Sequence, residues 1–249
     1  MIHYHGAPVT PTSAAIALFQ RRHACVSFAH PDQLSLVAEV CQSFMLDNGA
    51  FTVWKQGGTL DFDGYVEWVR EWRRHPGFDF ALIPDAIDGS ERDNIGLLSK
   101  WRESGLWEYG VPVWHMHESL EHLQYLAKAH PRVALGSSGV YATVGTTDWW
   151  ARMAEAMDAL CDDRGRPPCK LHGLRMLNPT IFSQLPLSSA DSTNVARNIG
   201  IDAAWDRAAY APRSKSVRAL VIADRIEHHA SAATWQRTRG TDMNLELFG

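Results

Sequence analysis

Three aspartates follow short apolar segments of this 249-residue chain. Asp47 comes after residues 44–46 and before Asn-Gly, a pair that permits the positive φ of a tight turn. Asp85 follows an apolar segment at residues 80–84, and Asp191 ends one at residues 188–191. In parallel α/β proteins the strand tips and the loops after them bind ligands. Carboxylates that meet there can serve as nucleophile and as general acid or base.

Other polar residues hold similar positions at the ends of apolar segments. They are His3, His5, His30, His115, His117, Gly136, Ser137, Ser138, His172, Gly173, Ser192 and Thr193. A single such residue is more often a helix cap or a loop hydrogen-bonder than a catalyst. Three carboxylates at three strand tips are harder to explain as caps alone, so we predict a site there.

The segments between these residues predict the fold. Apolar strand-like segments lie at residues 2–5, 25–29, 44–46, 80–84, 112–117, 133–135, 170–174 and 188–191. Segments with helical spacing lie at residues 13–22, 33–41, 63–73, 91–103, 120–129, 148–160 and 179–184. This alternation predicts βαβ units and a parallel sheet. We expect a compact (β/α)8 TIM barrel, one α/β domain over residues 1–249, with a doubly wound open sheet as the alternative.

Composition narrows the class of protein. With 45% apolar residues the chain can bury a large core, and its formal net charge of −4 argues against nonspecific coating of nucleic acid. No signal peptide or membrane span is visible, so we expect a cytoplasmic protein without a membrane partner. Cys25, Cys41, Cys161 and Cys169 lack CxxC spacing, which indicates reduced thiols and no zinc site.

The segment from residue 211 to residue 249 differs in character from the rest. Basic residues are spread along it: Arg213, Lys215, Arg218, Arg225, Arg237 and Arg239. Residues 217–226 have helical spacing, so we expect the segment to pack on the barrel and to present a basic face. This face is either a solvated helix surface or a phosphate-binding one.

Two motifs resemble those of a known enzyme family. Asp47-Asn48-Gly49-Ala50-Phe51 is similar to the strand-end Asp-Ser-Gly-Gly-Phe of tRNA-guanine transglycosylases. The stretch from Leu171-His172-Gly173-Leu174-Arg175-Met176 to Asp191-Ser192-Thr193 and Arg197 resembles the late strands that end in the family's nucleophile. The DNA-acting branch, which inserts 7-deazaguanine bases in phage and bacterial DNA, looks closest. The resemblance runs from about residue 46 to residue 197.

The resemblance implies a base-exchange glycosyltransferase, located in the host cytoplasm if phage-encoded. Guanine in DNA would be replaced by a preQ0-like 7-deazaguanine through a covalent aspartyl-deoxyribose intermediate, without a cofactor. Asp191 is then the nucleophile, and Asp47 is the general acid/base or an electrostatic stabiliser of the sugar. The partners are a flipped or single-stranded guanine nucleotide and the free base, and a homodimer is one option for the assembly.

The resemblance also assigns binding roles. Asp85 reads the guanine edge, His115 replaces a base-contacting Gln, and Phe51 stacks on the purine or is a core residue. The remaining substrate-binding residues are Asn48, Gly136, Ser137, Ser138, His172, Gly173, Ser192 and Thr193, and the phosphate-binding ones are Arg197, Arg213, Lys215 and Arg218. The family's cysteine-rich zinc subdomain has no counterpart, which implies no metal and favours DNA over tRNA.

Three other functions remain open. Transfer to tRNA is the nearest alternative. A metal-dependent amidohydrolase would bind its metal through His3 and His5, His115 or His117, His172 and Asp191. Against this function, the lysine that such barrels have on the fourth strand is absent at residues 82–85, and no histidine ends the sixth strand at residues 134–136. A non-enzymatic nucleic-acid-binding barrel would rest on the ten tryptophans and the basic tail.

Overall fold

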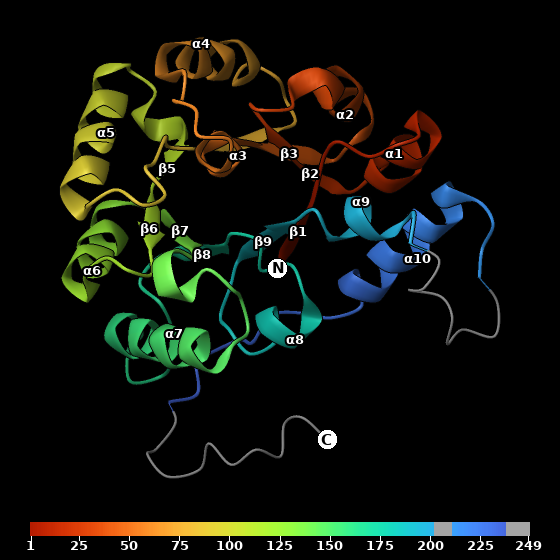
Figure 1. Cartoon of the computed structure of the whole chain (residues 1–249). Helices are drawn as coiled ribbons and strands as arrows, with labels where there is room; N and C mark the ends of the chain where they lie inside the picture. Colours follow the sequence, from red (N-terminus) through yellow and green to blue (C-terminus); the bar gives the residue numbers. More distant parts are fainter. Residues whose placement is uncertain (202–210, 238–249) are drawn as a thin grey trace.

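The computed structural model describes residues 1–201 and 211–237, and it shows a nearly closed parallel barrel surrounded by helices (Figure 1). Its nine strands have the order β5-β4-β3-β2-β1-β9-β8-β7-β6. They are β1 (Ile2–Gly6), β2 (His23–Ser27), β3 (Ser43–Asp47), β4 (Phe78–Leu82), β5 (Gly110–Val111), β6 (Val113–His115), β7 (Arg132–Gly136), β8 (Lys170–Gly173) and β9 (Ser189–Ser192). The predicted α/β architecture is confirmed, and the open doubly wound sheet is excluded.

The two ends of the sheet are adjacent in the chain. β5 pairs with β4 and β6 pairs with β7, and Pro112 alone separates β5 from β6. Proline has no N–H to donate to a ladder, so the strand switches neighbours at this residue. The Pro112 carbonyl accepts a hydrogen bond from the Ala134 amide at 2.9 Å. The seam of the barrel, between the edge strands β5 and β6, is therefore spanned by one residue of the chain.

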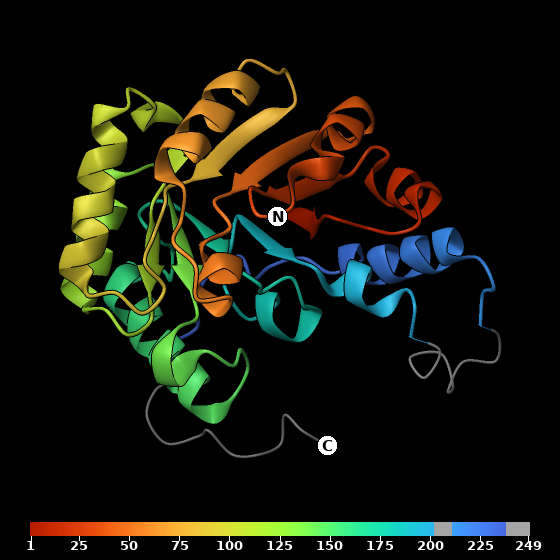
Figure 2. The ribbon, with the colours of Figure 1, turned by 45° about the horizontal axis from the view of Figure 1, so that its top comes forward.

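Helices cover the outside of the strands. They are α1 (Thr12–Phe19), α2 (Leu34–Val40), α3 (Ala50–Lys55), α4 (Phe62–Trp72), α5 (Glu91–Glu103), α6 (Leu120–Ala129), α7 (Thr147–Leu160), α8 (Pro179–Phe182), α9 (Asn194–Asn198) and α10 (Lys215–Glu227), with 3-10 turns η1 (Pro31–Gln33), η2 (Trp107–Tyr109) and η3 (Gly139–Tyr141). The short helices α3 and α9 were not predicted. They follow β3 and β9 directly and lie at the same end of the barrel as α8 (Figure 2).

Side chains alternate between the inside and the outside of the wall. One buried apolar cluster fills the interior, and it consists of Tyr4, Cys25, Met45, Phe80, Leu82, Val111, Val113 and Ala134. Their neighbours Phe44 and Leu46 belong instead to the larger cluster between strands and helices. Because Asp47 is two residues beyond Met45, it continues the inward row to the carboxyl end of β3.

The same alternation turns His3 and His5 away from the interior that holds Tyr4. His5 Nε2 lies 2.8 Å from Glu227 Oε1 at the end of α10, and His3 Nε2 lies 3.1 Å from the His229 carbonyl. This pair therefore contacts the C-terminal segment on the outside of the barrel.

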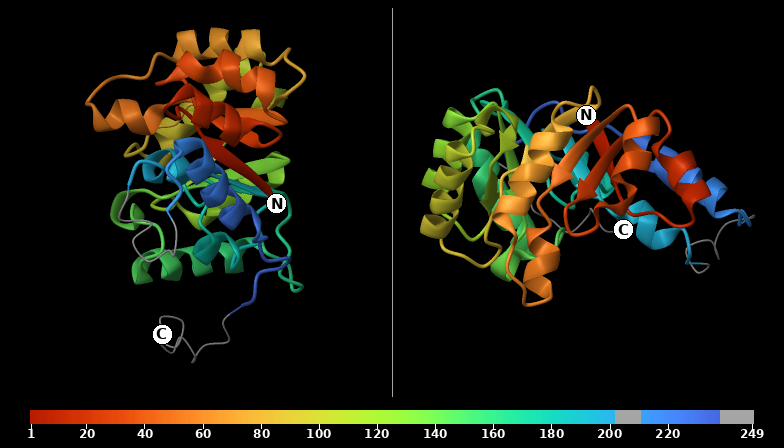
Figure 3. Two further views of the ribbon diagram at one scale, coloured as in Figure 1. Left: turned by 90° about the vertical axis from the view of Figure 1, so that its right-hand side faces the viewer. Right: turned by 90° about the horizontal axis from the view of Figure 1, so that it is seen from above.

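The C-terminal segment runs along two sides of the barrel. α10 packs on α1 (Figure 3), and Arg22 bridges the Glu227 and Asp224 carboxylates near its end. Further on, Trp235 Nε1 donates to Asp158 Oδ1 of α7 at 2.6 Å. Residues 238–249, with the predicted basic residue Arg239, lie outside the described residues.

Glycine at position 110 is required for packing at the seam. A Cβ there would meet Trp101 Nε1 and lie 2.7 Å from Ile83 Cγ1, and Trp101 is fully buried. We expect Gly110→Ala to lower the free energy of unfolding by roughly 1 to 3 kcal/mol in urea denaturation. The matched control is Gly96→Ala in α5, where a Cβ meets nothing within 4 Å; it should stabilise the helix by about 0.5 to 1 kcal/mol. Equal stability of the two variants would contradict this packing.

Candidate active site

Asp47, Asp85 and Asp191 meet at the carboxyl ends of the strands. Asp47 ends β3, Asp85 lies three residues beyond β4, and Asp191 lies in β9. The charges of Asp191 and Asp85 both raise the pKa of Asp47, which places each of them within electrostatic reach of Asp47. The barrel mouth thus holds the cluster that the sequence predicted at three strand tips.

The pKa of Asp47 is raised above its ordinary value. Burial is the main cause and raises its pKa to about 6; the Ser27 hydroxyl opposes this effect, and the charges of Asp191 and Asp85 add to it. The Gly49 amide donates to Oδ2 at 3.2 Å and also favours the charged form. A carboxyl group with this pKa exists in both protonation states under physiological conditions, as a general acid/base requires.

Asp191 is held by two donors on one oxygen. His172 Nε2 lies 3.3 Å from Oδ1, and the Arg175 amide donates to the same atom at 3.2 Å. His172 is fully buried beneath the carboxylate, where its Nδ1 lies 2.9 Å from Ser189 Oγ. Among the described residues Oδ2 has no hydrogen-bond partner, so this oxygen is available to a substrate.

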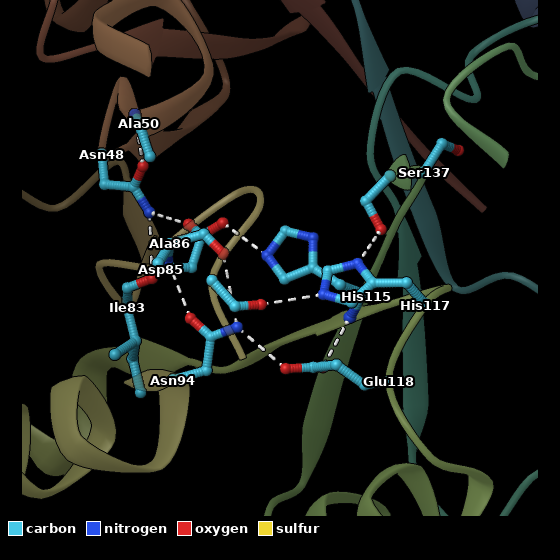
Figure 4. A network of polar contacts seen from close by, with 12 residues as sticks. Asn48, Ala50, Ile83, Asp85, Ala86, Asn94, His115, His117, Glu118 and Ser137 are labelled. Carbon is cyan, nitrogen blue, oxygen red and sulfur yellow. Dashed lines mark hydrogen bonds and ion pairs between the residues drawn. The ribbon is translucent and has the colours of Figure 1, made fainter. Parts of the chain in front are cut away.

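Asp85 has a partner on each oxygen. Asn48 Nδ2 donates to Oδ1 at 2.7 Å and to the Ile83 carbonyl at 2.9 Å, and His115 Nε2 lies 2.8 Å from Oδ2 (Figure 4). The Asn48 amide oxygen in turn accepts from the Ala50 amide at the start of α3. These contacts fix the carboxylate plane of Asp85 while each oxygen keeps a second lone pair.

The buried Glu118 contacts the backbone of His115, the residue that is paired with Asp85. Glu118 accepts from the His115 amide and from Asn94 Nδ2, each at 2.8 Å (Figure 4). Burial lowers the pKa of His115, but the hydrogen bond and charge of Asp85, helped by the charge of Glu118, outweigh burial and raise that pKa. His115 is therefore biased toward a cation between two carboxylates. Glu118 was not predicted as part of the site, because its contact with Asn94 joins residues 24 positions apart in the chain.

Arg175 contacts three parts of the mouth, namely β9, the loop after β7 and α3, and it was not predicted as a site residue. It follows β8 with a φ of 59°, a conformation that a non-glycine residue seldom adopts. Its guanidinium donates to the Ser137 carbonyl at 2.8 Å and lies 4.2 Å from the centre of the Phe51 ring. Its amide holds Asp191, as described above. The motif at residues 171–176 was the available signal, but it does not show that Arg175 contacts Ser137 and Phe51.

The loop after β7 presents its backbone to the mouth. A Cβ on Gly136 would lie 3.2 Å from His115 Nδ1, so glycine leaves room for that ring. The Ser137 hydroxyl accepts from Trp149 Nε1 at 2.9 Å, and the Ser138 hydroxyl lies 2.7 Å from His117 Nδ1. Both hydroxyls have protein partners, so a ligand here would meet main-chain groups.

Three other predicted substrate-binding residues have local structural contacts. A Cβ on Gly173 would lie 2.8 Å from Leu187, and Ser192 Oγ accepts from the Asn194 amide at 2.9 Å. Thr193 precedes α9 and packs against Gly6.

The predicted phosphate-binding residues lie on α9 and at or near the start of α10. Arg197 is exposed on α9, and Arg213 and Lys215 are exposed before and at the start of α10. Arg218 is half-buried and donates to the Pro212 carbonyl at 2.6 Å, which gives it a structural contact.

Among the described residues no cluster of three His, Cys, Asp or Glu side chains has the arrangement of a metal site. Within the same residues, no helix combines the length and apolarity needed to cross a membrane. No protein-family model matches the chain, and no curated protein matches it.

The pKa of Asp47 makes stability depend on pH. Its folded pKa of about 6 exceeds the ordinary 3.8, so the neutral form stabilises the fold at low pH and this contribution is lost as pH rises through 6. We expect Asp47→Asn to raise the free energy of unfolding by roughly 1 to 3 kcal/mol at about pH 8, with the gain vanishing near pH 4. Urea denaturation at both pH values measures this difference in the free energy of unfolding. The control is Asp88→Asn, because Asp88 is exposed. A gain independent of pH would contradict the assignment.

Proposed function

We propose that the protein is a base-exchange glycosyltransferase that replaces guanine in DNA with a preQ0-like 7-deazaguanine. One observation carries the proposal: two carboxylates at one mouth have different environments. Asp47 has a pKa raised to about 6, and Asp191 is oriented through Oδ1 with Oδ2 left for the substrate. Paired carboxyl groups with divided roles are the requirement for retaining glycosyl transfer.

The first half of the reaction forms an ester. Asp191 Oδ2 attacks C1′ of the deoxyguanosine while the bond from C1′ to N9 breaks, and the electron pair of that bond leaves with the base. Neutral Asp47 gives its proton to the departing guanine, which then leaves uncharged. The products of this half are the Asp191 ester and the Asp47 carboxylate.

The second half reverses these roles with a different base. Ionised Asp47 takes the proton from N9 of the incoming 7-deazaguanine, and N9 attacks C1′ as the ester bond to Asp191 breaks. Asp191 is released as a carboxylate and Asp47 is again neutral. A pKa near 6 suits this alternation, because both protonation states are accessible at neutral pH.

Asp85 supports recognition of guanine over adenine. Asn48 and His115 hold the Asp85 carboxylate in one plane, and its remaining lone pairs can accept from the N1–H and the 2-amino group of guanine. Adenine has no N1–H and no amino group at C2, so it cannot make this pair of hydrogen bonds. The neighbouring His115, biased toward the cation, suits a carbonyl oxygen on the same base edge. Phe51 is 37% exposed beside this site, so it is available for stacking and is no core residue.

The fold supports the proposal at a coarser level. If β5 and β6 are one strand interrupted at Pro112, the wall has eight strands, and we propose a compact (β/α)8 barrel without a zinc-binding subdomain. The choice of DNA over tRNA rests on the motif at Asp47–Phe51 and on that compactness. Transfer to tRNA remains the second candidate and is decided by the same assay.

The amidohydrolase alternative loses its support. His3 and His5, which would have provided the paired ligands, contact the C-terminal segment on the outside of the wall. His172 is already engaged by Ser189 and Asp191 within the barrel.

Exchange of bases is measured with radiolabelled guanine and with 7-cyano- or 7-aminomethyl-7-deazaguanine on DNA and tRNA in parallel. We expect incorporation into DNA, a loss of roughly 10⁴- to 10⁶-fold for Asp191→Ala, and a smaller loss of roughly 10²- to 10⁴-fold for Asp47→Asn. The larger loss follows from removal of the nucleophile, and the smaller one from removal of proton transfer alone.

The matched control is Asp88→Asn, an exposed carboxylate in the loop after β4, which should keep the wild-type rate. Incorporation into tRNA alone would transfer the assignment to the tRNA substrate. Absence of incorporation into either nucleic acid, or full activity of Asp191→Ala, would contradict the proposed reaction.

A further inference from the structure

A stack of side chains leads outward from the mouth along α3. The Arg175 guanidinium lies 4.2 Å from the centre of the Phe51 ring, and the Phe51 and Trp54 rings are 5.8 Å apart at 38°. Arg175 is bonded to Ser137 and Asp191 within the mouth, as described above. The rings of Phe51 and Trp54 therefore extend from Arg175, whose backbone amide contacts Asp191, to an exposed position on α3.

Trp54 differs from the other tryptophans in its environment. It is 45% exposed, and it is the only exposed tryptophan among the described residues. Trp101, Trp114 and Trp149 are fully buried in the core. Ala50 is the only buried residue of α3, so burial against the barrel does not explain the aromatic surface of this helix.

The chemistry of an extracted nucleotide fits this surface. An enzyme that acts on a base must take it out of the stack, and the flanking base then loses a stacking neighbour. Aromatic side chains replace such neighbours on single strands, and they tolerate any sequence because every base has a π-face. Lys55, exposed and next to Trp54, adds a positive charge where the strand backbone would pass.

We propose that Trp54 is a binding site for the nucleobase that flanks the exchanged guanine on the same strand. Phe51 and Arg175 then meet the extracted nucleotide, and Trp54 meets its neighbour. This inference rests on the proposed function, since it takes the substrate to be a polynucleotide. It assigns to α3 the task of holding the strand rather than that of packing the barrel.

The test compares Trp54→Ala and Trp54→Phe with the wild type on a single-stranded oligonucleotide that contains one guanine. A second oligonucleotide has abasic sites on both sides of that guanine. We expect Trp54→Ala to raise KM for the first substrate roughly 5- to 100-fold, with kcat within about twofold of wild type. Trp54→Phe should restore most of the affinity, because it keeps an aromatic face.

The abasic oligonucleotide separates stacking from a general structural effect. It should raise the KM of the wild type to a similar degree, and Trp54→Ala should then add little, because the two changes remove the same contact. Tyr125→Ala is the matched control: Tyr125 is 56% exposed on α6, and its loss should leave both KM values unchanged.

Two results would overturn the inference. One is an unchanged KM in Trp54→Ala, and the other is a rise that persists in full on the abasic oligonucleotide. Fluorescence anisotropy with the same labelled oligonucleotides measures binding without turnover, so it decides the role of Trp54 even if no exchange occurs. An absence of exchange would reject the proposed function but not the binding site at Trp54. Equal Kd values for the wild type and Trp54→Ala, or no binding by the wild type, would reject the binding site.

Discussion

The alternation of side chains across the barrel wall is the constraint on which the rest of the structure depends. Residues two apart on a strand share a face, so the row that begins with Met45 inside the barrel must end with Asp47 at the mouth. The apolar side chains below supply the desolvation that raises the pKa of Asp47. The same rule places Phe44 and Leu46 in the layer under the helices. The core and the chemistry of the mouth are thus set by one pattern.

Electrostatics then distinguishes the three carboxylates. Asp85 is paired with His115 and Asn48, and Asp191 is held by His172 and the Arg175 amide. Asp47 receives the Gly49 amide but no cationic partner at hydrogen-bond distance among the described residues. Burial, with a smaller contribution from the charges of Asp191 and Asp85, disfavours the charged form of Asp47 and raises its pKa. These environments are the basis for the proposed roles, proton transfer by Asp47 and attack on the sugar by Asp191.

Much of the fold was predictable because it depends on local patterns. Each predicted strand segment overlaps an observed strand, and Ser90 caps α5 through a capping box that a sequence can show. The tips of β3 and β9 were likewise visible as apolar runs that end in aspartate. Period-two alternation does not say which row faces inward, and this is why His3 and His5 were considered as metal ligands. The large Tyr4 ring, packed on Phe80 and His172, decides the question through contacts distant in sequence.

Two site residues that escaped prediction, Arg175 and Glu118, depend on such distant contacts. Arg175 takes its left-handed conformation between β9, the loop after β7 and α3, and Glu118 acts on the site only through His115 and Asn94. The short helix α3 has little core to bury and no periodic signal long enough to detect.

The central claim is that Asp191 attacks the sugar while Asp47 transfers protons. Its most direct test is peptide mass spectrometry of the protein quenched with acid during turnover on a guanine-containing oligonucleotide. The account predicts one deoxyribose-linked peptide, the one that contains Asp191, present in the wild type and absent from Asp191→Ala. An adduct on Asp47 or Asp85, or active exchange with no adduct at all, would contradict it.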